Sequence, residues 1–164
     1  MRGLWLYLDT SVINFLFAED SPEKKEVTHR FFNHHVGSGE YKVFVSDLVI
    51  REITRTPDSA QRERLLAVIR DHSLGVLDST KIADEIQTLA VAYVKSGVFP
   101  QKKLEDSLHV ALATVSGMDF LLSWNYRHLA NVNKEMLVQA VNLRLGYLKT
   151  PRMTTPMEVL HDDD

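Results

Sequence analysis

The chain of 164 residues contains no cysteine. It can therefore form neither a disulfide framework nor a zinc site built from thiolates. The apolar N-terminus could be mistaken for a signal peptide, but Asp9 and Asn14 interrupt it and no small-residue cleavage site follows. A cysteine-free chain without an export signal fits a reducing compartment, so we expect a cytoplasmic protein.

Long apolar runs and a strong net charge are also missing. No segment reaches the ~18 to 20 apolar residues that a spanning helix needs, so we expect a soluble protein without a membrane partner. The formal net charge of −3 gives no general attraction to a polyanion and counts against strong nonspecific DNA binding. Local cations do accompany the acids discussed below, which makes Arg51, Lys103 and Arg127 candidate substrate contacts. Solvated surface charge is the alternative reading of these cations.

The composition indicates one folded domain. With 45% hydrophobic and 25% charged residues, the chain can build one ordinary core, and it shows no repeat, linker or low-complexity block. We expect this domain to cover residues 1–150 and to be followed by an extension at 151–164. The last residues, 161–164, are predicted to be disordered.

Strand-like and helix-like segments alternate along the chain. This alternation predicts an α/β fold, a single three-layer α/β/α sandwich around a central, mostly parallel sheet. A further amphipathic helix is expected at residues 135–145, and Tyr147 and Leu148 are expected to add an edge strand. The expected strands are residues 4–8, 43–45, 74–77 and 120–122.

The stretch 104–131 is the one around which the chain is organised. Glu105 and Asp106 begin an almost wholly apolar helix, Gly117 stops it, and a short buried strand follows. Polar residues leave that strand at 123–125. Open α/β sheets bind ligands beyond the carboxyl ends of their strands, so Asn125 lies where chemistry is expected.

Two other acids occupy comparable positions. Asp9 closes the strand at 4–8, and Glu52 borders the apolar face of a helix that starts near Ser46. Asp9 alone could be a helix cap, and Glu52 alone could be a surface glutamate with a snorkelling stem. Together with Asp106 they would converge on one cleft. Clustered carboxylates repel one another without a cation, so their convergence predicts a hard divalent ion such as Mg²⁺ and phosphodiester hydrolysis as its use.

Three histidines, His29, His34 and His35, suggest a second metal site at first sight. Adjacent residues of a helix point in different directions, so His34 and His35 are not expected to share a ligand. We interpret all three as surface histidines.

Four motifs resemble, in order and separation, the acidic-site motifs of PIN domains. They are DTS at 9–11, REI at 51–53, EDSLHVA at 105–111 and LLSWN at 121–125. The likeness is greatest to VapC-type toxins of bacterial toxin–antitoxin pairs and covers nearly the whole chain, including TPRMTTPMEVL at 150–160, which is similar to the final-strand region of that group.

The resemblance implies a Mg²⁺- or Mn²⁺-dependent ribonuclease that cuts RNA by water attack, is usually a homodimer and is inhibited by a small antitoxin protein. Carried over by position, Asp9, Glu52 and Asp106 would be the metal-binding acids. Ser123 matches a supporting Ser/Thr, with Thr10 as a second supporting residue beside Asp9.

The departure from the family pattern is Asn125, which stands at the often acidic fourth position. A neutral amide removes one charge from any second-metal site, so we expect one tight metal and a second that depends on substrate. Glu105 could compensate, although an acid near a positive helix end needs no such role. Two alternatives stay open. The first is a catalytically weak PIN-like module for RNA binding or protein docking. The second is a metal-dependent phosphatase, but such enzymes commonly need an Asp-x-Asp arrangement, and this chain has Asp9-Thr10-Ser11.

Overall fold

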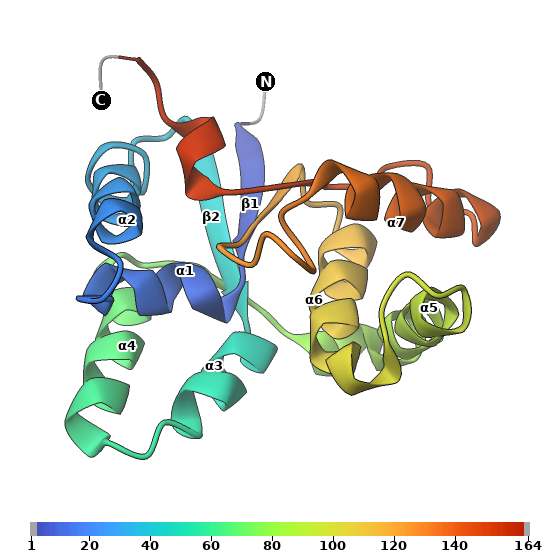
Figure 1. Ribbon diagram of the computed structural model, residues 1–164, viewed down its shortest axis with the longest axis horizontal. Coiled ribbons are helices and arrows are strands. Elements are labelled where there is room, and N and C mark those ends of the chain that lie inside the picture. The colour runs from blue at the N-terminus through green and yellow to red at the C-terminus, as the bar shows by residue number, and fades with distance from the viewer. Residues whose placement is uncertain (1–2, 163–164) are drawn as a thin grey trace.

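The computed structural model describes residues 3–162 and contains one five-stranded sheet (Figure 1). The strand order is β3-β2-β1-β4-β5, and all four pairings are parallel. The prediction of an α/β fold with a central parallel sheet is therefore confirmed. The strands are β1 (Leu4–Leu8), β2 (Tyr41–Ser46), β3 (Gly75–Leu77), β4 (Phe120–Leu122) and β5 (Arg152–Thr154).

Helices flank the sheet as two groups (Figure 1). The connections β1 to β2 and β2 to β3 supply the first four helices, and the connections β3 to β4 and β4 to β5 supply the other three. None of the helices among residues 3–162 is long and apolar enough to cross a membrane. The helices are α1 (Thr10–Asn14), α2 (Pro22–His34), α3 (Asp47–Thr54), α4 (Ser59–Asp71), α5 (Ala83–Lys95), α6 (Leu104–Val115) and α7 (Val132–Arg144).

The order in which the strands are added to the sheet reverses at β1. The first connections move outward from β1 to β2 and β3, whereas β4 returns to pair with the other side of β1, with Leu8 opposite Leu122. The carboxyl ends of β1 and β4 thus lie side by side, and the next residues, Asp9 and Ser123, leave the sheet together. Such a switch in strand order is where open α/β sheets bind ligands.

The helix α6 is apolar nearly all round because it packs inside the molecule. Residues 109–114 are all buried, and α6 lies against α5 and β4. Its first turn, with Glu105 and Asp106, reaches the edge of the sheet where the strands end. The buried helix therefore fixes the position of an acidic turn that the sequence had indicated.

Two expected elements near the C-terminus differ from the structure. The helix α7 begins at Val132 rather than Glu135, because Asn131 caps it by accepting a hydrogen bond from the Lys134 N–H at 2.8 Å. Its buried residues are Val138, Val141 and Asn142, whereas Met136 is 62% exposed. The apolar residues of α7 therefore do not all face the core as the periodicity predicts.

The edge strand expected at Tyr147 and Leu148 is wrong. These residues form no strand, and the Leu148 side chain is 86% exposed. The edge strand is β5, which pairs with β4, so the sheet includes residues beyond 150. A short 3₁₀ turn at Pro156–Val159 then packs the chain against α2.

Two further expectations concern histidines and the chain end. His29 and His34 are exposed as expected, but the expectation for His35 is wrong, because only 2% of it is exposed and it packs against Phe31 and Tyr41. The disorder expected at 161–164 does not hold for His161, which hydrogen-bonds Glu40. Residues 163 and 164 lie outside the described residues.

Candidate metal-binding active site

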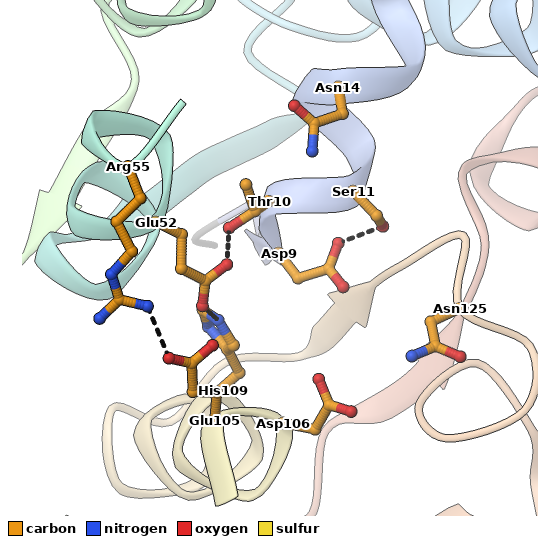
Figure 2. A pocket seen from close by; sticks show the side chains of 10 residues that line it. All are labelled: Asp9, Thr10, Ser11, Asn14, Glu52, Arg55, Glu105, Asp106, His109 and Asn125. Atoms are coloured by element: carbon orange, nitrogen blue, oxygen red, sulfur yellow. Dashed lines mark hydrogen bonds and ion pairs between the residues drawn. The ribbon is translucent and has the colours of Figure 1, made fainter. Parts of the chain in front are cut away.

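A polar cleft of about 420 Å³ opens at the carboxyl ends of β1 and β4 (Figure 2). All four residues expected to form the site line it, coming from the end of β1, from α3, from the first turn of α6 and from the loop after β4. The residues lining the cleft are Asp9, Thr10, Ser11, Asn14, Glu52, Arg55, Glu105, Asp106, His109 and Asn125.

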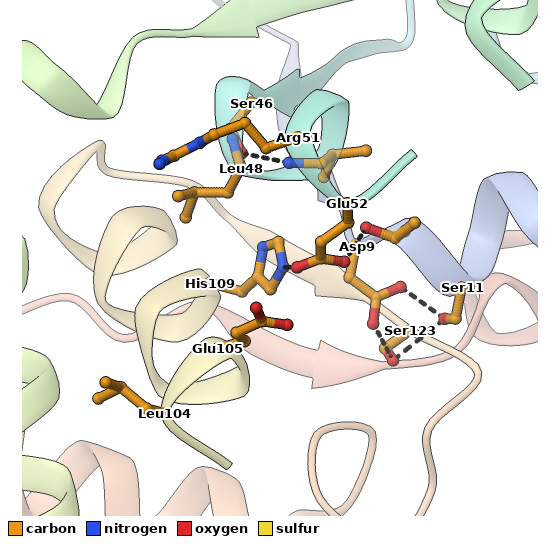
Figure 3. Close-up of polar contacts among 12 residues, drawn as sticks. Asp9, Ser11, Ser46, Leu48, Arg51, Glu52, Leu104, Glu105, His109 and Ser123 are labelled. Carbon is orange, nitrogen blue, oxygen red and sulfur yellow. Dashed lines mark hydrogen bonds and ion pairs between the residues drawn. The ribbon is translucent and has the colours of Figure 1, made fainter. Parts of the chain in front are cut away.

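Asp9 is the most buried of the acids, with 6% of its surface exposed. It stands at the N-cap position of α1 without a side-chain capping hydrogen bond, so capping does not explain it. Instead the Ser11 hydroxyl donates to Oδ1 and the Ser123 hydroxyl donates to Oδ2, each at 2.5 Å (Figure 3). These two bonds hold the carboxylate in one orientation at the strand end.

Backbone amides fix the direction of both serine hydroxyls. Ser11 Oγ accepts the Trp124 N–H at 2.9 Å, and Ser123 Oγ accepts the Asn125 N–H at 2.9 Å. Each hydroxyl therefore has its own proton left to donate, and each gives it to Asp9. The loop after β4 thus directs two hydroxyl donors to the carboxylate, Ser11 from α1 and its own Ser123. Such bonds favour an ionised Asp9.

Glu52 projects from α3 and has a partner on each carboxylate oxygen. His109 Nε2 lies 2.7 Å from Oε1, and the Thr10 hydroxyl donates to Oε2. The Glu52 side chain is 22% exposed, and it lines the cleft between its two partners. The reading of Glu52 as a snorkelling surface residue therefore does not fit its surroundings.

A buried chain of hydrogen bonds extends from Glu52 to the start of α3. His109 Nδ1 is 2.7 Å from the Tyr7 hydroxyl, which is 2.7 Å from Ser46 Oγ. Ser46 Oγ accepts the N–H groups of Leu48 and Val49, so the Ser46 hydroxyl proton is available to donate to Tyr7.

The donor and acceptor of each hydrogen bond between Ser46 and Glu52 follow from these backbone donors. Because Ser46 donates to the Tyr7 oxygen, Tyr7 donates to His109 Nδ1, and a neutral His109 carries its proton on Nε2, where it is donated to Glu52. Two backbone amides at a helix start thereby select the histidine tautomer that stabilises the Glu52 carboxylate.

Asp106 lies in the first turn of α6 and faces the space between Asp9 and Asn125 (Figure 2). In the part of the chain that the structure describes, no hydrogen bond to its carboxylate is found. It is therefore the acid with the most free lone pairs toward the cleft.

Asn125 presents its amide nitrogen to the cleft. Its Oδ1 accepts the His128 N–H at 3.1 Å and so lies on the side of the loop, while Figure 2 shows Nδ2 directed toward Asp106. The fourth position thus offers a hydrogen-bond donor rather than an oxygen ligand. The local turn explains why, since Asn125 also accepts the Leu129 and Ala130 N–H groups on its backbone carbonyl.

The cations are distributed around the cleft rather than within it. Arg55 lines the cleft and pairs with Glu105 at 2.7 Å, so Glu105 already has a cationic partner. Arg51 is 60% exposed and pairs with Asp47 at 3.4 Å, bordering a small hollow next to the cleft. Lys103 stands immediately before α6, and Arg127 is exposed in the loop after β4. Neither residue lines the cleft itself.

Burial and hydrogen-bonding or charged neighbours shift the pKa values of the acids in opposite directions. Burial raises the pKa of Asp9 despite its two serine donors, and burial also raises the pKa of Asp106. For Glu52, burial alone would raise the pKa, but His109 and Thr10 lower it overall. Burial opposes a charged His109, yet the carboxylates of Glu52, Asp9 and Asp106 raise the pKa of its imidazole. The cleft therefore holds more negative charge than its surroundings accommodate easily.

These features fit a divalent cation of the magnesium type. Three carboxylates from separate elements line one small polar space, and burial raises the pKa of Asp9 and Asp106, so a bound cation would favour their charged forms. Asp9, Glu52 and Asp106 retain oxygen lone pairs for such an ion, whereas Asn125 turns its nitrogen inward. The donor set is all oxygen, which Mg²⁺ and Mn²⁺ prefer.

Sequence reasoning missed several residues that build this site, including Ser11, His109 and Tyr7. His109 had a usable signal, since it follows Asp106 by three residues and therefore lies on the same face of α6. The roles of Ser11 and Tyr7 depend on contacts across the sheet, which no local spacing reveals.

Two comparisons with known proteins found similarity to this chain. The model of the PIN domain family matches residues 6–135. Among solved structures, a chain in the crystal structure of VapBC2 from Rickettsia felis bound to a DNA fragment from the promoter is similar in fold, with a TM-score of 0.53 and 14% sequence identity over 76% of this chain and 90% of that chain. No curated protein gave a significant match. The family match covers most of the chain, the four acidic-site positions included, and the chain belongs to the PIN domain family.

Proposed function

We propose that this protein is a Mg²⁺- or Mn²⁺-dependent endoribonuclease and the toxin of a toxin–antitoxin pair. The observation that carries the proposal is the meeting of Asp9, Glu52 and Asp106 in one cleft, with Asp9 already oriented by two serines. PIN domains are generally nucleases, which agrees with this chemistry.

Each residue has a definable task in phosphodiester hydrolysis. Asp9, Glu52 and Asp106 would hold the metal, which when bound supplies positive charge for the phosphate oxygens and acidifies water. Ser11 and Ser123 keep the Asp9 carboxylate in place, and His109 does the same for Glu52.

The remaining polar groups suit the RNA rather than the metal. The Asn125 amide can donate to a phosphate oxygen or to water at the cleft, a role open to nitrogen and closed to a carboxylate. Arg51, Arg55, Lys103 and Arg127 would contact the RNA backbone from the rim, which offsets the overall negative charge of the protein.

A protein that cuts cellular RNA must be restrained in the cell. We propose that a small antitoxin blocks the cleft with a cationic side chain that replaces the charge of the metal among the three acids. The fold similarity to a chain from a VapBC2 crystal structure supports this choice of partner.

We also propose a homodimer, because an apolar face is exposed on α7. Val132, Met136 and Leu143 lie at helical spacing and are each at least half exposed, and Tyr126 and Met157 border the hollow beside Val132. An exposed face of this kind is typical of a subunit contact.

The direct test is cleavage of a mixed cellular RNA pool by untagged protein. Cleavage should require Mg²⁺ or Mn²⁺, stop with a chelator and be absent in Asp106→Asn. Substituting Asp71, an exposed acid at the end of α4, by Asn serves as the matched control and should leave cleavage unchanged. Metal-independent cleavage, or full activity of Asp106→Asn, would refute the proposed reaction.

Toxicity is tested separately. Expression of the chain alone should arrest growth, and Asp9→Asn or co-expression of a small protein encoded beside it should relieve the arrest. Inhibition by that protein should weaken as Mg²⁺ rises, since both compete for the same carboxylates.

The second candidate is an RNA-binding or protein-docking module without useful turnover. The inward-facing nitrogen of Asn125 favours it, because the cleft then lacks the fourth acid. Harmless expression together with RNA binding and no cleavage would select this module instead.

A further inference from the structure

A second cluster of potential metal ligands lies at the opposite end of the sheet from the cleft. His35 directly follows α2, Glu40 precedes the first residue of β2, and His161 follows the 3₁₀ turn near the C-terminus. The cleft lies beyond the carboxyl ends of the strands, whereas this cluster lies beside the amino end of β2. The two groups therefore share no residue and no element end.

The three side chains already converge. His161 Nε2 is 2.8 Å and 3.0 Å from the two carboxylate oxygens of Glu40, and His35 Nδ1 is 3.5 Å from Glu40 Oε2. The two imidazole rings lie 4.9 Å apart, and a ligand atom from each of the three residues falls within 4.8 Å of the other two.

Surrounding contacts hold the cluster in position. His35 is almost fully buried and packs against Phe31 and Tyr41. The Tyr41 hydroxyl donates to the Val159 carbonyl at 3.3 Å, and Val159 itself is part of the core. The segment that carries His161 is therefore fixed two residues before the histidine, which reduces the entropy that a ligand would lose on binding a metal.

Ligand chemistry identifies the ion. Two imidazoles and one carboxylate form the ligand set of many zinc sites with an open fourth position, with ligand bonds of about 2.0 to 2.2 Å. In a tetrahedron of that size, neighbouring ligand atoms are about 3.3 Å apart. The distance from His161 Nε2 to the Glu40 oxygens, 2.8 and 3.0 Å, and the distance from His35 Nδ1 to Glu40 Oε2, 3.5 Å, lie around this value.

We propose that His35, Glu40 and His161 bind a transition-metal ion, preferentially Zn²⁺, that fastens the C-terminal segment to α2 and the start of β2. Nitrogen ligands distinguish this site from the all-oxygen cleft, so Zn²⁺ and Co²⁺ should prefer the cluster while Mg²⁺ prefers the cleft. Imidazole and carboxylate bind a metal in their deprotonated forms, so binding should release protons. The site is independent of the proposed ribonuclease activity.

The test uses untagged, full-length protein carrying Asp9→Asn, so that binding in the cleft is weakened. Co²⁺ is added first, because tetrahedral Co²⁺ with nitrogen ligands absorbs visible light far more strongly than octahedral Co²⁺ with oxygen ligands. Zn²⁺ is then titrated to displace it. We expect one Co²⁺ per chain with a tetrahedral spectrum, loss of that spectrum on adding Zn²⁺, and a higher melting temperature with Zn²⁺ than with Mg²⁺.

Variants separate the site from general histidine binding. His161→Ala and Glu40→Gln change exposed side chains, so they should fold normally and bind Zn²⁺ more than ~10-fold more weakly. His34→Ala removes the exposed histidine next to His35 and should bind as the parent protein does. A Co²⁺ spectrum without the tetrahedral bands, or equal Zn²⁺ affinity in all variants, would show that His161 and Glu40 form only a hydrogen-bonded pair.

Discussion

Hydrogen-bond donors determine the orientation of two of the acids in the cleft, Asp9 and Glu52. The Trp124 and Asn125 amides direct the Ser11 and Ser123 hydroxyls toward Asp9, and amides at the start of α3 set the polarity that ends in the His109 bond to Glu52. The two arrangements begin at different helix and strand ends and meet only at the cleft. The orientation of Asp9 and Glu52 is therefore set by hydrogen bonds of the fold itself.

The variants Asp9→Asn and Asp106→Asn should abolish metal-dependent cleavage and yet fold normally. At neutral pH we expect Asp106→Asn to raise the melting temperature by roughly 2–4 °C, equivalent to about 1 kcal/mol, because a partly buried charge without a hydrogen-bond partner among the described residues is removed. Asp9→Asn should gain less, because its amide nitrogen cannot accept one of the two serine hydrogen bonds. Thermal melts without divalent ions and RNA cleavage assays measure the two effects. A variant that loses its fold together with its activity would contradict the assignment of that acid.

The same stabilisation should depend on pH in a defined direction. Burial raises the pKa of Asp9 and Asp106 in the folded protein, so the folded state binds protons more tightly than the unfolded chain. The contribution of these two acids to stability should therefore fall as pH rises from 3.8 through their raised pKa values. In urea unfolding across this pH range, the free energy of unfolding of the Asn variants should increase relative to that of the wild type as pH rises. A difference that stays the same at every pH would disagree with the raised pKa values.

The variant Tyr7→Phe tests the buried chain behind Glu52. Loss of the hydroxyl leaves Ser46 without an acceptor and His109 Nδ1 without a donor, which should cost about 1–3 kcal/mol of stability and roughly 10-fold in Mn²⁺ affinity. Tyr93→Phe is the matched control, since Tyr93 is also fully buried but bonds Asn142 instead. If both variants lose stability and neither loses Mn²⁺ affinity, the buried hydrogen bonds behind Glu52 have a purely structural role.

The variant Asn125→Asp should increase binding of a second metal ion. One aspartate oxygen can keep the bond to the His128 N–H while the other replaces the amide nitrogen in the cleft. We expect tighter binding of the second Mn²⁺ and higher activity at low Mn²⁺. An unchanged titration would show that this side chain does not reach the ion.

At the scale of elements, strands and buried helices could be predicted from the sequence because their apolar runs are continuous. Residues 4–8 and 120–122 are the strands expected, and α6 is the apolar helix expected after Asp106. The errors fall where burial is one-sided or absent. Met136 is apolar but exposed on α7, while Asn142 is polar but fully buried and bonded to Tyr93, so hydrophobicity alone misassigns the buried face.

The site could be predicted in part for a related reason. Asp9, Glu52, Asp106 and Asn125 follow strand or helix ends that the sequence reveals, and the sheet brings those ends together. The direction in which Asn125 points could not be predicted, because it depends on the turn to His128. The burial of His35 likewise depends on Tyr41 and His161, which are distant in sequence.

The exposed face of α7 leads to a prediction about assembly. Met136→Glu places a charge on this exposed face without changing the core. Light scattering should therefore show a monomer in place of a dimer. The melting temperature of that monomer should stay close to that of an isolated wild-type subunit. Leu148→Glu, which is exposed outside α7, should remain dimeric. A dimeric Met136→Glu would move the subunit contact elsewhere.

At the scale of the whole molecule, the sheet separates two sites of different chemistry. Oxygen ligands gather at the carboxyl ends of the strands, and the imidazoles of His35 and His161 gather with Glu40 beside the amino end of β2. The first site is proposed to bind Mg²⁺ or Mn²⁺ for RNA cleavage and the second to bind Zn²⁺ for attachment of the C-terminal segment. Under both proposals, metal selectivity follows from the ligand types gathered at each end of the sheet.

The central claim is that Asp9, Glu52 and Asp106 form a divalent metal site, and Mn²⁺ titration of the metal-free protein by calorimetry tests it most directly. Wild-type protein should bind one Mn²⁺ tightly in the absence of RNA, and His161→Ala should bind it equally well. Asp9→Asn and Asp106→Asn should lose this binding while remaining folded. Equal Mn²⁺ affinity in the wild type and in both Asn variants would contradict the account.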